Sequence, residues 1–291
     1  MATFIALLAS GIALGAIFAL GALGFLVLYK ATGVISFAHG DLITLGAYIA
    51  IWATVDLKFP TVVGYLVAIG CLLLVGILLE RIAYAPLRGK SIHVVVISTL
   101  GAALVIRAII GIWQGTLPRS LGSPVGERVW RVAGANISYQ RILIVGVTGV
   151  AVFALLMLFN KTSLGRQVRA LAADPQTARL QGIRMTRMSM MAWALSAGVA
   201  GLAGVLVGPL SAVDLNLGFG IMLNSFAAAI LGGFGSLEGV VVAGLVLGIV
   251  NQTFGGYYLR DYKDAYPFVV MILVIAFRPQ GLFSRPTSAR L

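Results

Sequence analysis

About nine apolar segments, separated by more polar stretches, constrain this chain more than any other feature. They cover residues 3–28, 34–55, 61–82, 92–112, 139–159, 188–210, 222–234, 237–256 and 264–279. A helix of about 20 apolar residues crosses the hydrocarbon core of a bilayer, and its backbone hydrogen bonds are satisfied within the helix itself. The pattern predicts an all-α polytopic membrane protein with about eight to ten transmembrane helices, some discontinuous or re-entrant. We expect residues 1–291 to form a single domain.

Composition and charge agree with a membrane protein. Only 10% of the residues are charged and 60% are hydrophobic, whereas a soluble domain carries about 25% charged residues. A net charge of +12 would suggest nucleic-acid binding in a soluble domain. Membrane proteins, however, collect Lys and Arg in their cytoplasmic loops. We therefore expect this chain to contact lipid and no nucleic acid. From the distribution of the basic residues we also expect the N-terminus outside and the C-terminus inside.

Two long polar stretches separate the apolar segments. Residues 113–138 carry Pro, Gly and mixed charge, which is typical of an ordered extracytoplasmic loop. Residues 160–187 are basic and are assigned to the cytoplasm by the same charge rule. Within them, Asp174 before Pro175 is a plausible N-cap, and Gly182 is a plausible helix stop. The sequence predicts a short helix here, too short to be stable alone in water.

Polar residues interrupt the second apolar segment. From Lys30 to Asp41 is about 16 Å along a helix, so Asp41 would lie near mid-membrane. His39 and Asp41 are two residues apart, and on a helix they would point in different directions. The glycines around them, Gly33 and Gly40, suggest an unwound segment lining a protein-enclosed cavity. Either Ser36, Phe37, His39, Gly40 and Asp41 belong to a gate or pathway, or they only brace the helix break.

A second candidate break follows the seventh apolar segment. Two short hydrophobic segments flank a glycine-rich stretch, which is the pattern of discontinuous helices in transporters. The residues concerned are Gly232, Gly233, Gly235, Ser236 and Glu238. The triplet Ser36-Phe37-Ala38 recurs at 225–227, which is weak support for an internal repeat. Close helix packing and a simple turn would explain the glycines equally well.

Three amide side chains lie among apolar residues: Asn224, Asn251 and Gln252. Such amides more often bridge helices than bind ligand, and both roles remain open.

The motifs for enzymatic chemistry are incomplete. Gly89-Lys90-Ser91 resembles the end of a phosphate loop, but Tyr84 occupies the position of its first glycine. One Cys and two His make a His- or Cys-rich metal site improbable on composition. A membrane enzyme using His39 and Asp41 would still need a nucleophile, and the sequence positions none. We expect no catalytic residues, no metal site and no cofactor bound by this chain.

Four stretches resemble a known family. They are GVISFAHGDLITLGAYIA, SLGRQVRALAADPQTARLQGIRMTRM, AAILGGFGSLEGVVVAGLVLGI and FRPQGLF. Together they resemble the permeases of branched-chain amino acid ABC importers, most closely the LivH-type branch. Similar permeases carry urea, short amides or other amino acids, and the motifs do not separate these substrates.

The resemblance implies a permease domain in the bacterial inner membrane that forms the translocation pathway. It implies a second related permease, two cytoplasmic ATPases that bind ATP and Mg, and a periplasmic solute-binding protein. A cytoplasmic helix would couple the permease to the ATPases, with matching positions at Arg169, Ala172, Ala173, Asp174, Gly182 and Ile183. This chain departs from the family pattern at Leu171, where a glutamate is usual. That departure leaves the docking register open.

A different class of function remains as the alternative. A self-contained secondary transporter or channel would need ion ligands or a pore, and Asp41 with Glu238 could supply carboxylates. Such a protein has no need of a docking helix in residues 160–187.

Overall fold

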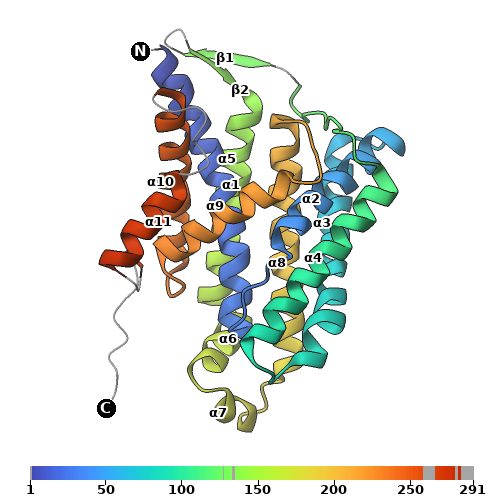
Figure 1. Ribbon diagram of the computed structural model, residues 1–291, viewed down its shortest axis with the longest axis vertical. Coiled ribbons are helices and arrows are strands. Elements are labelled where there is room, and N and C mark those ends of the chain that lie inside the picture. The colour runs from blue at the N-terminus through green and yellow to red at the C-terminus, as the bar shows by residue number, and fades with distance from the viewer. Residues whose placement is uncertain (1, 127, 133–134, 258–265, 279–280, 283–291) are drawn as a thin grey trace.

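The computed structural model describes residues 2–126, 128–132, 135–257, 266–278 and 281–282. The expected all-α architecture is confirmed, and each of the nine apolar segments corresponds to a helix in this part of the chain (Figure 1). These helices are α1 (Ala2–Thr32), α2 (His39–Ile51), α3 (Thr61–Leu79), α4 (Ile92–Gln114), α5 (Tyr139–Lys161), α8 (Met185–Val207), α9 (Leu217–Gly232), α10 (Leu237–Tyr257) and α11 (Tyr266–Phe277).

The helices differ in their capacity to cross a membrane. Helices α1, α3, α4, α5 and α8 are long and apolar enough to span a bilayer by length and composition. Helix α3 is continued by η2 (Glu80–Tyr84) and η3 (Ala85–Leu87), and α8 by η4 (Gly208–Leu210). Helix α2 has 13 residues and is extended by η1 (Trp52–Asp56), while α9 has 16. These shorter helices are the discontinuous elements that the sequence predicts.

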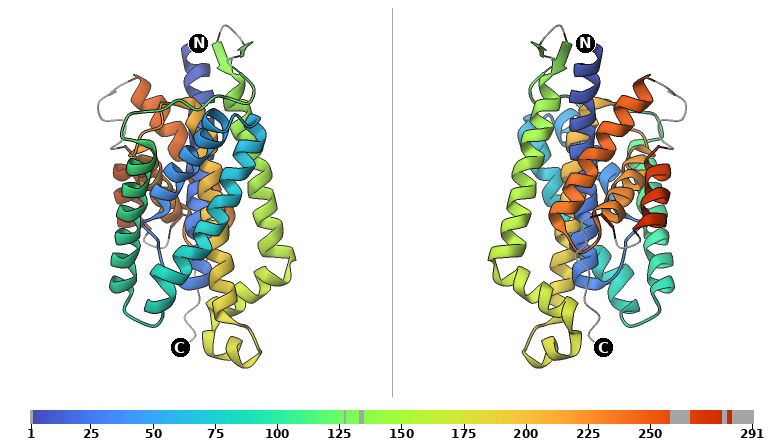
Figure 2. Two further views of the ribbon diagram at one scale, coloured as in Figure 1. Left: turned by 90° about the vertical axis from the view of Figure 1, so that its right-hand side faces the viewer. Right: turned by 90° about the vertical axis from the view of Figure 1, so that its left-hand side faces the viewer.

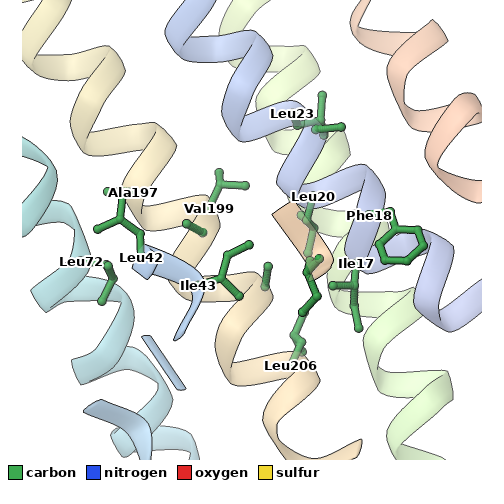
Figure 3. Close-up of a cluster of buried hydrophobic side chains, with 14 of the residues drawn as sticks. Ile17, Phe18, Leu20, Leu23, Leu42, Ile43, Leu72, Ala197, Val199 and Leu206 are labelled. Atoms are coloured by element: carbon green, nitrogen blue, oxygen red, sulfur yellow. The ribbon is translucent and has the colours of Figure 1, made fainter. Parts of the chain in front are cut away.

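Helix α1 lies in the interior, where it packs against α5, α8, α9 and α10. Figure 3 shows part of the core, which includes Leu20 and Leu23 of α1 and Leu206 of α8. Ile43 of α2 and Leu72 of α3 extend this cluster on the other side of α8. Figure 1 shows α9 running obliquely across the bundle rather than along it.

Glycines allow α1 and α10 to approach closely. A Cβ atom on Gly15 would lie 2.8 Å from the Cα of Leu245, and one on Gly248 would lie 2.2 Å from the Cα of Gly15. Real Cβ atoms are not found at such distances from backbone, so only glycine fits at these positions. Gly11 and Gly15, like Gly244 and Gly248, are four residues apart, which is the small-residue spacing of membrane helix pairs.

The peripheral helices expose apolar side chains. Leu66 and Leu74 of α3, Leu104 of α4 and Val150 of α5 are each more than half exposed. In water these side chains would form a large apolar surface, but lipid tails solvate them without cost. The outer surface therefore fits a bilayer.

The two long polar stretches lie at opposite ends of the molecule. One end carries the start of α1 and a hairpin of β1 (Val129–Val132) and β2 (Ala135–Ser138), as both views in Figure 2 show. The strands are antiparallel, with Val129 opposite Ser138. The sequence did not predict this hairpin within residues 113–138. The other end carries α6 (Ser163–Ala173) and α7 (Pro175–Leu180).

Candidate functional site

The chain leaves helical geometry between α1 and α2. Helix α1 ends at Thr32, and Gly33 follows in a left-handed conformation with φ of +70°. Residues 33–36 are extended or bent and 37–38 form a turn before α2 begins at His39. The backbone N–H of Phe37 in this break donates to the Oγ1 of Thr99 in α4, at 3.3 Å. A polar side chain of α4 thus satisfies part of the freed backbone, as an unwound segment in a membrane requires.

Gly40 lies inside the first turn of α2 and not in the unwound segment. A Cβ atom on Gly40 would lie 3.0 Å from the carbonyl oxygen of Gly218 in α9 and 3.1 Å from the Cβ of Met222. Gly40 thus follows the unwound stretch directly, and its assignment to a pathway or helix break stays a prediction. Its glycine is needed because α9 crosses α2 at short range.

His39 and Asp41 face different neighbours. The ring centroids of His39 and of Phe25 in α1 lie 4.6 Å apart, with the two rings tilted relative to each other. The Nδ1 of His39 lies 3.4 Å from the Oγ of Ser196 in α8. Gly24 makes room for it, because a Cβ there would lie 2.3 Å from the imidazole Cε1. His39 is thus packed between α1 and α8.

Asp41 forms an ion pair with Arg107 of α4. The Nε of Arg107 donates to the Oδ1 of Asp41 at 2.9 Å. The Asp41 side chain is 5% exposed and that of Arg107 is 32% exposed, so the acid is the more buried partner. Sequence analysis missed Arg107, although an arginine inside the apolar segment 92–112 is itself unusual at membrane depth.

The glycine-rich stretch forms a tight turn between α9 and α10. Gly232 ends α9, and Gly233 has a φ of +79°. The Oγ of Ser236 accepts a hydrogen bond from the N–H of Gly239 at 3.0 Å, which caps the start of α10. The Nζ of Lys30 at the end of α1 donates to the carbonyl oxygen of Gly235 at 3.0 Å.

Glu238 is exposed in the first turn of α10, where a carboxylate is favourable next to the helix N-terminus. Asp41 is instead buried against Arg107. No group of three or more His, Cys, Asp or Glu side chains that could hold a metal ion was found among the described residues.

The repeated Ser-Phe-Ala triplets meet in space. The rings of Phe37 and Phe226 lie 6.1 Å apart, and Phe25 contacts Phe226 edge-on at 5.9 Å. Ser36 and Ser225 are both buried. The break before α2 and the middle of α9 therefore belong to one packed region.

The stretch 160–187 contains two helices joined at Asp174. The Oδ1 of Asp174 accepts a hydrogen bond from the N–H of Gln176 at 2.9 Å, and its Oδ2 accepts one from the hydroxyl of Thr177. These bonds, first of all that from Thr177, lower the pKa of Asp174. Helix α7 ends in a left-handed turn at Gly182, with φ of +82°. Figure 1 shows α7 protruding beyond the ends of the long helices.

Helix α6 connects α7 to the transmembrane bundle. The guanidinium of Arg169 donates to the carbonyl oxygen of Phe159, near the end of α5. Val168 and Leu171 are buried, while Ala172 at the C-terminal end of α6 is exposed. After Gly182, the N–H of Ile183 donates back to the carbonyl oxygen of Ala178 at 3.1 Å, so the chain turns tightly into α8.

Comparison with protein families decides the assignment. The model of the family described as branched-chain amino acid transport system / permease component matches residues 7–275. The chain belongs to this family. It is 33% identical to the high-affinity branched-chain amino acid transport system permease protein BraD of Pseudomonas aeruginosa, over 96% of this chain and 95% of BraD. It is 31% identical to the permease protein LivH of Escherichia coli K12, over 95% of this chain and 94% of LivH.

Two more distant matches were also found. The ribose import permease protein RbsC of Escherichia coli K12 is 26% identical over 62% of this chain and 57% of RbsC. Among solved structures, PsaBC from Streptococcus pneumoniae in complex with Fab matches with a TM-score of 0.50. That match covers 94% of this chain and 89% of the other at 14% identity, which shows the fold alone.

Proposed function

We propose that this chain is the permease subunit of an ATP-driven importer in the bacterial inner membrane, and that it carries branched-chain amino acids or related small zwitterions. The family match over residues 7–275 carries this proposal, because it covers both helix breaks and the α6–α7 stretch together. The permease does no covalent chemistry. ATP and Mg are bound by separate ATPase chains, and this chain binds no cofactor.

The α6–α7 stretch supplies the mechanical link in this proposal. Helix α7 is short, capped at Asp174 and stopped at Gly182, so it can move as a rigid element. Helix α6 is seated tightly on α5, since a Cβ on Gly165 would lie within 1.9 Å of the carbonyl oxygen of Phe159. A push on α7 by a closing ATPase pair would therefore pass through α6 to α5 and α1. The helices then rock between inward-open and outward-open states around the pathway.

The assembly includes a second related permease, two ATPases and a periplasmic solute-binding protein. The proposed orientation has α6 and α7 in the cytoplasm, and the β1–β2 hairpin and N-terminus outside. Single cysteines at Ser120 and Gln181, in a Cys71→Ser background, test the orientation. An impermeant maleimide added to whole spheroplasts should label only the cysteine at position 120. Labelling of position 181 alone would reverse the orientation.

Reconstitution tests the function. The tagged chain is purified with its co-purifying subunits, which are identified by mass spectrometry, and is placed in proteoliposomes with the binding protein. Uptake of radiolabelled leucine should require ATP on the ATPase side and should stop when the ATPases are left out. Uptake that persists without any ATPase would overturn the importer proposal and favour a self-contained secondary transporter. Competition by urea and by short amides would define the substrate class.

A further inference from the structure

A cavity of about 640 Å³ lies between α1, α5, α9, α10 and α11. Asn224 of α9, Asn251 and Gln252 of α10 and Arg141 of α5 line it together with Phe18 and Phe268. We name it the amide cavity. It lies toward the end of the molecule that carries the N-terminus and the hairpin, because Arg141 is in the first turn of α5 directly after β2. Its volume is within the range of small-molecule sites.

Asn224 lines the amide cavity and carries a buried acceptor. The residue is 6% exposed, and its Nδ2 donates to the carbonyl oxygen of Gly220 at 2.8 Å. Its Oδ1 receives no hydrogen bond from any group in the described part of the chain. Leaving a buried amide oxygen without a donor is unfavourable. The position therefore suits a ligand that brings N–H donors.

Arg141 brings a positive charge to the amide cavity. The three arginines Arg88, Arg107 and Arg119 each pair with a carboxylate. For Arg141, no carboxylate within ion-pair distance was found among the residues that the structure describes. A partly buried guanidinium binds a carboxylate through two parallel N–H donors. The position therefore suits an anionic group.

Most of the remaining wall is apolar, with Ser10 and Ser211 as its other polar residues. Leu14 and Phe18 of α1, Leu217 and Ile221 of α9, and Phe268 of α11 line it. An acceptor for N–H groups, a cation and an apolar wall around one space are complementary to an α-amino acid with an apolar side chain.

We propose that the amide cavity is a substrate site of the permease itself, which binds an apolar amino acid as its zwitterion. The carboxylate pairs with Arg141, the ammonium donates to the Oδ1 of Asn224, and the side chain packs on Phe18 and Phe268. This inference rests on the proposed function and deepens it. The permease would then select its substrate after the binding protein has released it, instead of passing every small solute.

Direct binding tests the site independently of transport. The full-length chain, with the subunits that co-purify, is placed in phosphatidylcholine nanodiscs without ATP or binding protein, and radiolabelled leucine is titrated. Arg141→Gln and Asn224→Ala should each weaken leucine binding about tenfold or more, as expected for a hydrogen bond to a charged group. Arg128→Gln and Asn216→Ala, at exposed positions outside the cavity, are the matched controls and should bind as the unmodified chain does.

Analogues of leucine test which end of the ligand, carboxylate or ammonium, each residue binds. Leucinamide lacks the carboxylate, so Arg141→Gln should not change its affinity. The carboxylic acid that lacks only the amino group of leucine should bind equally to the unmodified chain and to Asn224→Ala. Equal effects of each variant on all three ligands would overturn the assignment.

A lipid phosphate could occupy Arg141 by the same chemistry. In that case the unmodified chain would bind no leucine, and phosphatidylglycerol that co-purifies with it would be lost in Arg141→Gln. That outcome would overturn the substrate site. ATP-dependent uptake in proteoliposomes would still be present, so the proposed function would survive. Absence of both binding and ATP-dependent uptake would reject the two proposals together.

Discussion

Arg107 of α4 holds Asp41 of α2 through a single hydrogen-bonded ion pair, with the Nε of Arg107 2.9 Å from the Oδ1 of Asp41. Thr99, in the same helix α4, accepts a hydrogen bond at its Oγ1 from the backbone N–H of Phe37. Helix α4 therefore fixes both the unwound segment after α1 and the first turn of α2. A charged side chain costs free energy at membrane depth unless it is paired. Because Asp41 and Arg107 must therefore stay together, the ion pair couples the position of α4 to that of the break.

Loss of Arg107 should destabilise the protein more than loss of the Asp41 charge. In Arg107→Gln the 5%-exposed carboxylate remains without its partner, at a cost of about 3–5 kcal/mol. In Asp41→Asn the remaining charge is on the 32%-exposed arginine, which can reach more polar surroundings. Thermal midpoints in detergent should follow this order, with the double variant Asp41→Asn/Arg107→Gln above Arg107→Gln. A double variant no better than Arg107→Gln would contradict the pairing.

Transport measurements distinguish whether Asp41 acts in the translocation pathway or only stabilises the helix break. If Asp41 acts in the pathway, Asp41→Ala should lower ATP-driven uptake more than it lowers the amount of assembled complex in the membrane. We expect this outcome because the ion pair joins α4 to the first turn of α2, which directly follows the break. Equal loss of uptake and of complex would assign Asp41 a purely structural role.

Close packing of α1 on α10 should fail when a side chain is added. Gly15→Val and Gly248→Val force atoms into backbone of the facing helix at less than 3 Å. We expect a severe loss of folded protein, measured by fluorescence-detected size exclusion. Gly101→Val in α4 is the matched control, because nothing lies within 4 Å of a Cβ at Gly101. It should lose little, since only a small change in helix propensity remains. Similar losses at all three positions would reject the close approach.

The helices were predictable because their causes are local. Apolar length identifies the segments, and the glycines near 33 and 233 mark the places where helices stop. The Asp174 cap and the Gly182 stop were predictable for the same reason, since each depends on a few neighbouring residues.

Features that depend on tertiary contacts were not predictable in this way. The partner of Asp41 is 66 positions away in the sequence, and only the packing of α2 on α4 brings it near. The close contact of Gly40 with Gly218 is equally remote in the sequence and was not predictable either. The amide cavity combines three amides noted in the sequence with Arg141, which had no apparent role until α5, α9 and α10 were placed together. The strands β1 and β2 have four residues each, too few for their alternation to stand out.

Helix α7, the proposed coupling helix, should be required for coupling transport to ATP hydrolysis. Gly182→Pro cannot adopt the φ of +82° found there, and Asp174→Arg removes the acceptor that caps α7. Both variants should insert into the membrane normally and bind the ATPases, yet leucine uptake per ATP hydrolysed should fall at least several-fold. The measurement is simultaneous uptake and phosphate release in proteoliposomes.

Two conservative variants control for that experiment. Gly182→Asn tolerates the left-handed conformation, and Asp174→Asn keeps a capping oxygen. Both should retain most of the coupling. If Gly182→Asn uncouples as strongly as Gly182→Pro, the geometry of the turn is not what matters.

The ion pair between Asp56 and Arg119 should hold the loop around Arg119 in place over a defined pH range. The guanidinium of Arg119 bonds to Asp56 at 2.8 Å, while the backbones of Arg119 and Val213 exchange two hydrogen bonds at 2.9 and 2.8 Å. The hydrogen bond from Arg119 lowers the pKa of Asp56 below its ordinary value of 3.8. The pair is therefore fully present above pH 3.8 and is lost as the pH falls through the lowered pKa. Hydrogen exchange at Arg119 and Val213, corrected for intrinsic rates, should stay slow from pH 7 to 5. Asp56→Asn should speed it at pH 7, while Lys58→Gln nearby should not. Unchanged exchange in Asp56→Asn would mean that the backbone bridge holds the loop alone.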